Sequence, residues 1–372
     1  MAQIFEQTRI GTLTLPNRLV RSATWEAMAE HDGTVTPRLV EVYEALAAGG
    51  VGLVISSYIT VHPQGRQNPD QIGGHEDAHM EGLSRIAKAV HAHGRPIVGQ
   101  IVHCGGQSQR KAMGGLDPLA PSAVKSPGYP EVPRAMTASD IEEVRDSFAH
   151  AAVRLQRAGF DGVQLHGAHG YLLAEFLSPS RNQRDDRYGG SLENRSRFTL
   201  EVFQAIRQAV GSDFPILIKL NAHDFIPDST TEVDATFLAQ RLAEAGIDAI
   251  EVSGGTGGSG KYGAARPRIE VPGGEAYFLP QARAIREVTA GVPLILVGGV
   301  RSPETIERIL EEGVADCFAM SRPLIREPDL PKRWERGDRT RSPCVSCLGC
   351  FGPARRGEGI RCVDKEREEA GT

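Results

Sequence analysis

The stretch 293–325, PLILVGGVRSPETIERILEEGVADCFAMSRPLI, contains one full unit of the pattern that decides the fold. It begins with a short apolar run, PLILVG, and continues through a pair of glycines into a segment whose apolar residues recur every three or four positions. A second apolar run, DCFAMS, follows. Apolar strands that alternate with amphipathic helices are typical of a parallel sheet that helices cover. The stretch therefore predicts a strand–helix–strand unit.

The same unit recurs along the whole chain. Apolar runs occur at RLVRSA (18–23), VGLVIS (51–56), PIVGQIV (96–102), DGVQLH (161–166), PILIKLN (215–221), DAIEVS (248–253), PLILVG (293–298) and DCFAMS (316–321). Helical patterns separate them, and several end in glycine, which tolerates the left-handed cap. Eight such units predict an α/β fold, a single (β/α)₈ TIM barrel. An open doubly wound sheet is the alternative, but the first unit lacks the glycine-rich turn that usually opens one.

Composition excludes several classes of protein. The 372 residues carry a net charge of −5, with 40% hydrophobic and 24% charged residues, which is an ordinary soluble balance. This charge gives no reason to expect a nucleic acid or an anionic membrane as partner. No apolar run approaches the ~20 residues of a membrane span, and the start MAQIFEQTRIG lacks the features of a signal peptide. We therefore expect a cytoplasmic protein with a small-molecule substrate.

Polar residues gather where the predicted strands end. Those ends carry Ser22, Ala23, Thr24 and Trp25, Ser57 and Tyr58, Gln100 and His103, His166, His169 and Tyr171, Lys219 and Asn221. The carboxyl ends of the strands form the active face of such barrels. A buried amide or lysine costs several kcal/mol unless its polar atoms find partners, and a polar ligand would supply them. The pattern predicts a ligand site at this end of the barrel.

A phosphate site is predicted beside it. Gly298 and Gly299 follow the seventh strand, and their backbone N–H groups can approach an anion closely. Ser302-Pro303 then opens a helix whose positive end would face the same place. Arg322, after the eighth strand, adds a planar cation. Barrel phosphate sites are commonly built from these two loops, although the pattern does not say which molecule carries the phosphate.

Five segments together resemble the old yellow enzyme family, the FMN-dependent ene reductases, over residues 3–335. They are PNRLVRSAT (16–24), DGTVTPRLVEVYEALAAGGVGLVISSYITVHPQGR (32–66), GQIVHCGGQS (99–108), HGAHGYLLAEFLSPSRNQRDDRYGGSLENR (166–195) and GGVRSPE with MSRPLI (298–304, 320–325). The resemblance implies FMN as cofactor and NADH or NADPH as reductant. It places Gln100 against the flavin pyrimidine ring and Lys219 beside flavin N1 and O2. The other implied FMN contacts are Ala23, Thr24, Ser57, Gly298, Gly299, Ser321 and Arg322.

The resemblance also assigns the chemistry. It implies that His166 and His169 grip the carbonyl oxygen of an activated alkene and that Tyr171 donates a proton. Hydride addition to the β carbon places negative charge on that oxygen, and loss of one preorganised donor typically costs ~3–4 kcal/mol of barrier. A tyrosine with an ordinary pKa of ~10 is protonated at neutral pH and can protonate the α carbon.

Three positions depart from the family pattern. Trp25 stands where relatives place Thr or Cys near the flavin C4 carbonyl, which makes it a candidate substrate-binding residue. Tyr58 aligns with a residue that is usually small. Lys219 replaces the arginine of many relatives, so the charge is kept and the planar fork is lost.

Four cysteines crowd the C-terminal end, in CVSCLGCFGPARRGEGIRC (344–362). The spacing of Cys344, Cys347, Cys350 and Cys362 suits a 4Fe–4S cluster. It resembles the cluster segment of the trimethylamine dehydrogenase and dienoyl-CoA reductase branch of the family. A structural zinc ion or free thiols are the alternatives. We expect two parts, an FMN-binding barrel over 1–340 and a cysteine-rich tail over 341–372 without a strand or helix pattern.

Two other functions stay open at this point. The same flavin could serve an amine or steroid-type dehydrogenase. A flavin-free barrel, either a phosphosugar isomerase or a phosphate-binding protein, would carry the phosphate site without redox chemistry. The sequence names neither the physiological alkene nor the preferred nicotinamide, and it leaves a homo-oligomer open.

Overall fold

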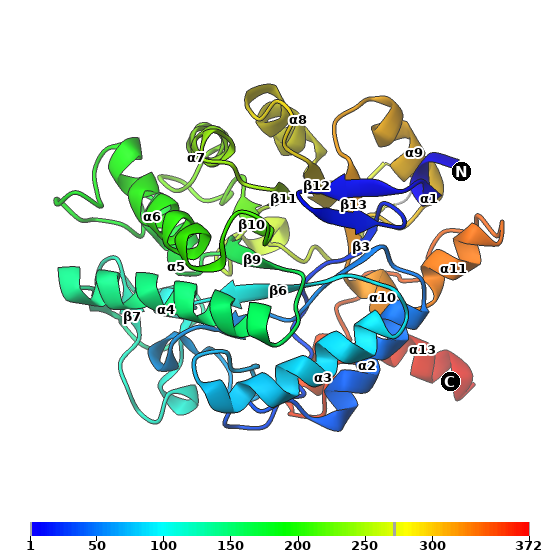
Figure 1. Ribbon diagram of the computed structural model, residues 1–372, viewed down its shortest axis with the longest axis horizontal. Helices are drawn as coiled ribbons and strands as arrows, with labels where there is room; N and C mark the ends of the chain where they lie inside the picture. Colours follow the sequence, from blue (N-terminus) through cyan, green and yellow to red (C-terminus); the bar gives the residue numbers. More distant parts are fainter. Residues whose placement is uncertain (1, 271–272, 372) are drawn as a thin grey trace.

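The computed structural model describes residues 2–270 and 273–371. Parallel strands form a closed barrel, which confirms the predicted fold (Figure 1). Every barrel strand overlaps its predicted run. The strands are β3 (Leu19–Arg21), β4 (Leu53–Ile55), β6 (Ile97–Val102), β9 (Gly162–Gly167), β10 (Ile216–Asn221), β11 (Ala249–Ser253), β12 (Leu294–Val297) and β13 (Cys317–Met320). Pairing of β13 with β3 and of β4 with β6 closes the circle, and the short β5 (Ile59–Thr60) pairs with the end of β6.

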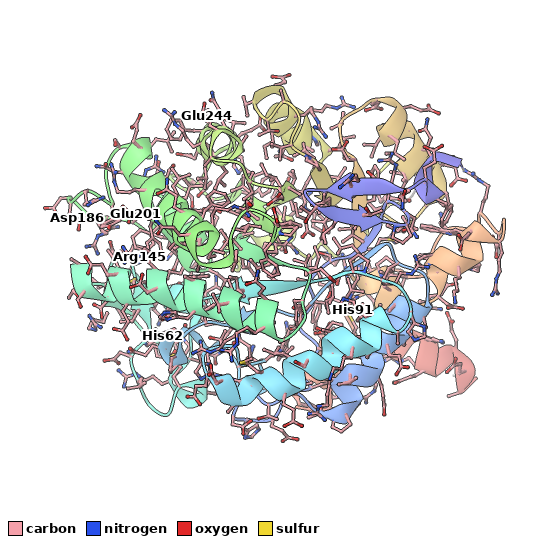
Figure 2. The ribbon with its side chains drawn as sticks, in the orientation of Figure 1. His62, His91, Arg145, Asp186, Glu201 and Glu244 are labelled. Carbon is pink, nitrogen blue, oxygen red and sulfur yellow. The ribbon has the colours of Figure 1, made fainter. Side chains whose placement is uncertain are left out.

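Helices surround this barrel. They are α2 (Pro37–Ala48), α3 (Met80–His91), α4 (Ala138–Arg157), α6 (Leu192–Val210), α7 (Glu232–Glu244), α8 (Leu279–Val288), α9 (Pro303–Glu311) and α10 (Arg322–Arg326). Thr137 and Asp140 cap α4 reciprocally, which fixes where that helix begins. Figure 2 shows Arg145, Glu201 and Glu244 on the outer helices α4, α6 and α7. Charge on the outside leaves the apolar faces to pack on the strands.

An N-terminal hairpin, which the sequence analysis did not predict, closes one end of the barrel. It consists of β1 (Thr8–Ile10) and β2 (Leu13–Leu15), which pair antiparallel after the short α1 (Ala2–Phe5). Ile10 and Leu15 are fully buried and belong to the same apolar cluster as Val20, Leu53 and Leu217. Val20, Leu53 and Leu217 lie in the first half or at the middle of their strands. The hairpin therefore covers the amino-terminal end of the barrel. The opposite end stays available for a site.

The C-terminal segment differs from its prediction. It was expected to lack helices, but it contains α12 (Phe351–Arg355) and α13 (Val363–Glu369), which follow α11 (Leu330–Glu335). Figure 1 shows α13 close to α10, and Arg326 of α10 forms a 2.5 Å ion pair with Asp364. The Ile360 backbone N–H donates to the Glu26 carbonyl (2.8 Å). Such short helices give a weak pattern in sequence, because five and seven residues make fewer than two helical turns.

The remaining elements lie in loops. β7 (Leu119–Ala120) and β8 (Arg134–Ala135) pair within the long connection from β6 to α4, and α5 (Leu172–Leu177) precedes α6. Within the described residues, no helix combines the length and apolar character that crossing a bilayer requires. The division at residue 340 stays a prediction.

Candidate active site

A cavity of about 280 Å³ opens at the carboxyl ends of the barrel strands. With one exception, every residue that the sequence analysis assigned to the flavin, the substrate or the proton lines this cavity. These residues are Ala23, Thr24, Trp25, Gln100, His166, His169, Tyr171, Lys219, Gly298, Gly299, Ser321 and Arg322. They come from six of the eight strands or their loops, so only the closed barrel brings them together.

Ser57 is the exception. It lies outside the lining of the cavity, and its backbone N–H donates to the hydroxyl of Tyr43 (2.6 Å). The same Tyr43 hydroxyl donates to the buried Glu26 carboxylate (3.2 Å), which forms an ion pair with Arg21 (3.2 Å). Ser57, two residues after β4, therefore contacts a buried polar cluster outside the cavity lining, and its neighbour Tyr58 lines the cavity instead.

One corner of the cavity holds His166, His169 and Tyr171. The ring of His166 meets those of His169 and Tyr171 edge-on, with centroids 5.1 Å and 4.7 Å away. His166 is the penultimate residue of β9, and the chain then turns sharply through His169 (φ 63°) and Gly170 (φ 79°). A left-handed histidine is uncommon and is held only where the surroundings fix it. Here the His169 backbone N–H donates to Asn221 Oδ1 (3.1 Å).

Both histidines of this corner are neutral. Burial, with His169 and Lys219 nearby, holds the pKa of His166 well below its usual range. Burial and Lys219 lower the pKa of His169 to about 3. The Ala168 N–H donates to His166 Nδ1 (3.4 Å), so the ring proton lies on Nε2. His169 Nε2 shares a hydrogen bond with Ser253 Oγ (2.8 Å). Two neutral rings can therefore donate hydrogen bonds from their N–H groups without adding positive charge to the cavity.

Tyr171 is protonated in this surrounding. Burial raises its pKa well above the usual 10, and Tyr129 and Cys104 add to the rise. Its hydroxyl donates to Gln67 Oε1 (3.1 Å), which also accepts from the Tyr58 hydroxyl (2.9 Å). No sequence pattern pointed to Gln67, because it lies in an irregular segment between β5 and α3. The hydroxyls of Tyr58 and Tyr171 therefore share one acceptor, Gln67 Oε1, in the lining of the cavity.

Beside this corner, the cavity wall carries an amide and an ammonium group, and Lys219 is the register partner of His166. Gln100 Nε2 donates to Gln164 Oε1 (2.7 Å), and Lys219 Nζ lies 3.2 Å from Glu251 Oε1. Lys219 also donates to Ser22 Oγ (2.9 Å). Gln164 and Glu251 were missed in the sequence analysis. Their signal was a polar residue in the middle of an otherwise apolar strand, in DGVQLH and DAIEVS.

The predicted phosphate end is built from two loops. Gly298 (φ 123°) and Gly299 (φ 81°) have backbones that favour glycine, and an added Cβ would lie 2.9 Å from Phe278 and 2.8 Å from Ile269. Arg322 donates to the Arg266 carbonyl (2.8 Å). Ser321 Oγ lies 2.8 Å from Thr24 Oγ1. Both loops also line the cavity.

The α9 helix contributes differently from its prediction. Its N-terminus was expected to face the phosphate, but Glu275 already occupies it. Glu275 Oε2 accepts from the backbone N–H groups of Arg301 (2.9 Å) and Ser302 (3.1 Å), and Ser302 Oγ donates to the same carboxylate. A carboxylate is a favourable partner for these free N–H groups. The donors left for a phosphate are those of the glycine pair, Ser321 and Arg322.

The predicted Trp25 is held by a residue that the sequence analysis did not foresee, since its Nε1 donates to Asp70 Oδ1 (3.3 Å). From the C-terminal segment, Ser346 and Phe351 line the cavity, and Arg301 connects to that segment through the Cys344 carbonyl (2.7 Å). The tail therefore completes the wall of the site.

The four C-terminal cysteines lie around a second, smaller cavity of about 20 Å³. Its lining includes Cys344, Cys347, Cys350 and Cys362 together with Arg322. Burial raises the pKa of the Cys350 thiol to about 11; Arg322 lowers it, and the other three thiols add to the rise. Within 2–270 and 273–371, no group of three or more His, Cys, Asp or Glu side chains has the geometry to hold a metal ion.

The shape and donors of the main cavity suit a flat ring with a phosphate tail. The glycine pair leaves room that any Cβ would fill. At the other end, Gln100 Oε1 lines the cavity wall without a donor among the described residues. FMN has both features, a hydrogen-bonding pyrimidine ring and a phosphate.

Comparison with known proteins agrees with this fit. Residues 3–341 match the family model described as the NADH:flavin oxidoreductase / NADH oxidase family. An NADH oxidase of Thermoanaerobacter brockii is 40% identical over 94% of this chain and 53% of its own length. An NADPH dehydrogenase of Geobacillus thermodenitrificans is 38% identical over 86% of this chain and 89% of its own. The chain spans about half the length of the first of these relatives.

Solved structures give the same result. A 2-naphthoyl-CoA reductase in complex with 2-naphthoyl-CoA superimposes with a TM-score of 0.91 at 30% identity, over 98% of this chain and 57% of that one. An old yellow enzyme homologue from Zymomonas mobilis gives a TM-score of 0.79 at 29% identity, over 92% and 95%. These matches confirm the family that the motifs predicted. The chain belongs to the NADH:flavin oxidoreductase / NADH oxidase family, the family of the old yellow enzymes.

Proposed function

We propose that the protein is an FMN-dependent NAD(P)H oxidoreductase that reduces the C=C bond of α,β-unsaturated carbonyl compounds. The corner formed by His166, His169 and Tyr171 carries the proposal. It places two neutral imidazoles and a protonated phenol on one side of a cavity that suits a flavin. The family match supports the cofactor and the reductant, and a neighbour named for an aroyl-CoA reductase fits the substrate class.

Each side chain has a defined task in this reaction. Bound FMN would supply the hydride to the β carbon. The N–H groups of His166 and His169 would donate to the substrate carbonyl oxygen as negative charge develops there, and neutral rings do so without forming an ion pair that must later break. Tyr171 would then give its proton to the α carbon, and Gln67 positions that hydroxyl.

The other residues would hold the cofactor and shape access. Gln100 and Lys219 would bind the pyrimidine ring, while the loops after β12 and β13 would bind the phosphate through Gly298, Gly299, Ser321 and Arg322, next to Ala23 and Thr24. Trp25, fixed by Asp70, would limit the substrates that enter. Three further expectations stay predictions. They are NADH or NADPH as the reductant, a homo-oligomer, and a cytoplasmic location.

Rapid mixing of the reduced holoenzyme with substrates under anaerobic conditions tests this function. A cyclic enone should reoxidise the reduced enzyme within one turnover, and the oxidised enzyme should be inert toward primary and tertiary amines. The amine arm matters because a histamine dehydrogenase also superimposes on this chain, with a TM-score of 0.86 at 28% identity. Reduction of the oxidised enzyme by an amine, with no reaction toward enones, would assign the dehydrogenase function instead.

We further propose that Cys344, Cys347, Cys350 and Cys362 hold a 4Fe–4S cluster. All four line one small cavity. The first three have the C-x₂-C-x₂-C spacing of iron–sulfur ligands, and Cys362 would supply the fourth thiolate. Anaerobically purified protein should contain about four iron atoms and four sulfides per chain; one zinc ion or no metal would contradict the proposal.

A further inference from the structure

Buried polar side chains form a continuous hydrogen-bonded chain beneath the cavity. Gln100 Nε2 donates to Gln164 Oε1 (2.7 Å), and Gln164 Nε2 donates to Glu251 Oε2 (2.9 Å). The other carboxylate oxygen, Glu251 Oε1, accepts from the Ser22 hydroxyl (2.7 Å) and lies 3.2 Å from Lys219 Nζ. All five side chains are buried, and Glu251 is completely inaccessible to solvent. Glu251 does not line the cavity, but it links the two residues proposed for the pyrimidine ring.

The carboxylate sets the direction of every hydrogen bond in this chain. A carboxylate accepts and does not donate, so Gln164 must turn its NH₂ group toward Glu251. The oxygen of Gln164 then faces Gln100, which must turn its own NH₂ group toward Gln164. This leaves Gln100 Oε1 at the cavity as an acceptor. The ring N–H between the two pyrimidine carbonyls of a flavin is the matching donor.

The same carboxylate also acts on the ammonium group. Of the three N–H groups of Lys219, one points to Ser22 Oγ (2.9 Å) and one to Glu251, which leaves one for the cavity. Lys219 and Glu251 are register partners on adjacent strands, so backbone pairing holds the two charges together. A negative charge that develops beside Lys219 is attracted by the ammonium group and repelled by the Glu251 carboxylate. The carboxylate therefore weakens the net attraction.

We propose that Glu251 is a positioning residue for the flavin, which directs the Gln100 carbonyl oxygen toward the ring through Gln164 and moderates the positive field of Lys219. The proposal rests on the placement of FMN given under the proposed function. Its tests use FMN affinity and reduction potential, which require no alkene. A result on Glu251 is therefore separate from a result on substrate.

The first test is Glu251→Gln, which keeps the volume and removes the charge. Lys219 and Ser22 would bind the new amide oxygen, so the new NH₂ group would face Gln164. Gln164 and Gln100 would both reverse, and Gln100 would present NH₂ to the flavin N–H. Loss of this hydrogen bond should raise the Kd of FMN about tenfold. Without the opposing carboxylate, Lys219 should raise the two-electron reduction potential of bound FMN by about 30 mV, which is a tenfold change in the equilibrium constant of reduction.

The second test is the exchange Glu251→Gln with Gln164→Glu, which conserves charge and volume. A carboxylate at position 164 accepts from both neighbours, so Gln100 regains its original direction. Position 164 is not the register partner of Lys219, so the negative charge has moved away from the ammonium group. The Kd should return to within about twofold of the wild-type value, while the potential stays raised. A purely structural role of Glu251 would not separate the two readouts.

Two further variants complete the design. Glu175→Gln replaces another buried carboxyl group, whose pKa burial raises to about 7 and which binds the Gly106 N–H (2.9 Å) far from Lys219 in the hydrogen-bond network, and it should change neither readout at pH 8, where this group is mostly ionised. Gln164→Met interrupts the hydrogen-bonded chain but keeps Glu251. It should therefore weaken FMN binding and leave the reduction potential unchanged. This variant also serves as the test if Glu251→Gln does not fold. Wild-type affinity and potential in Glu251→Gln, or no recovery of affinity in the exchange variant, would overturn the proposal. A wild-type protein without affinity for FMN would overturn the proposed function and this assignment with it.

Discussion

The ring of His166 meets the ring of Tyr171 edge-on, with 4.7 Å between their centroids and an interplanar angle of 85°. The group proposed to bind the substrate oxygen and the group proposed to give the proton therefore occupy one corner of the cavity. Because they have separate backbone and side-chain anchors, Ala168 for His166 and Gln67 for Tyr171, their roles can be separated by substitution.

Tyr171→Phe should slow the reduction of an enone by about 10²- to 10⁴-fold, the usual contribution of a general acid. It should leave the reduction of the flavin by NAD(P)H nearly unchanged, because that half-reaction needs no proton from Tyr171. Stopped-flow measurement of both half-reactions checks this. Tyr58→Phe is the matched control, since Tyr58 donates to the same Gln67 oxygen, and its effect on the enone step should be small. Equal losses in both half-reactions of Tyr171→Phe would remove the proton-donor role.

His166→Ala should weaken the binding of phenols, which mimic the developing enolate, by about tenfold or more through loss of one hydrogen bond to a charged oxygen. His166→Asn keeps a donor and should recover part of the affinity. Titration of the phenol-to-flavin charge-transfer band measures the Kd. An affinity in His166→Ala equal to the wild-type value would show that this imidazole does not contact the anion.

The pH dependence of enone reduction should be flat between about pH 5 and 8.5. An unperturbed histidine titrates near 6.5, but burial lowers the pKa of His169 to about 3 and holds that of His166 well below normal. Burial also raises the pKa of Tyr171 well above 10. All three groups therefore keep their protons as described across this range. An inflection near pH 6.5 in the single-turnover rate would contradict the neutral histidine pair.

The depressed histidine pKa values also affect stability, and the sign follows from proton uptake. Between the unfolded pKa near 6.5 and the folded value of about 3 for His169, the unfolded chain binds more protons than the folded chain. The free energy of unfolding therefore falls as pH falls through this window. His169→Asn should reduce that slope in denaturant titrations at pH 4, 5 and 6.5, and an unchanged slope would contradict the assignment.

Leu15→Ala should lower the free energy of unfolding by about 2–5 kcal/mol, because Leu15 is a fully buried part of the hairpin that closes the amino-terminal end of the barrel. Leu13→Ala, at a half-buried position of the same strand, should cost less. Thermal and denaturant unfolding measure both. A smaller loss of unfolding free energy in Leu15→Ala than in Leu13→Ala would contradict the role of the hairpin in closing the barrel.

Much of the fold could be predicted from the sequence. Buried parallel strands are apolar throughout, so runs such as PILIKLN identify them without ambiguity, and their ends mark the active face. The hairpin at Thr8–Leu15 was missed because three-residue strands carry too little pattern. The helices of the C-terminal segment were missed because they have only five and seven residues, and the segment is held by contacts distant in sequence, such as Arg326 with Asp364 and Ile360 with Glu26.

The candidate site was predicted unevenly for similar reasons. Strand-end residues such as Gln100 and Lys219 were found because their position follows from the strand pattern. Gln67 and Ser346 reach the cavity from irregular segments, whose path no periodicity predicts, and Phe351 reaches it from the five-residue α12. Glu275 took the N-terminus of α9 that was expected to serve a phosphate, and that competition between two acceptors depends on tertiary structure alone.

A single measurement tests the central claim, that this cavity holds FMN. The protein, purified without added flavin and then denatured, should release one riboflavin phosphate per chain, and the apoprotein should take up FMN but not riboflavin with comparable affinity, because Gly298, Gly299 and Arg322 hold the phosphate. A protein that releases no flavin and binds none, or that binds riboflavin as tightly as FMN, would contradict the account.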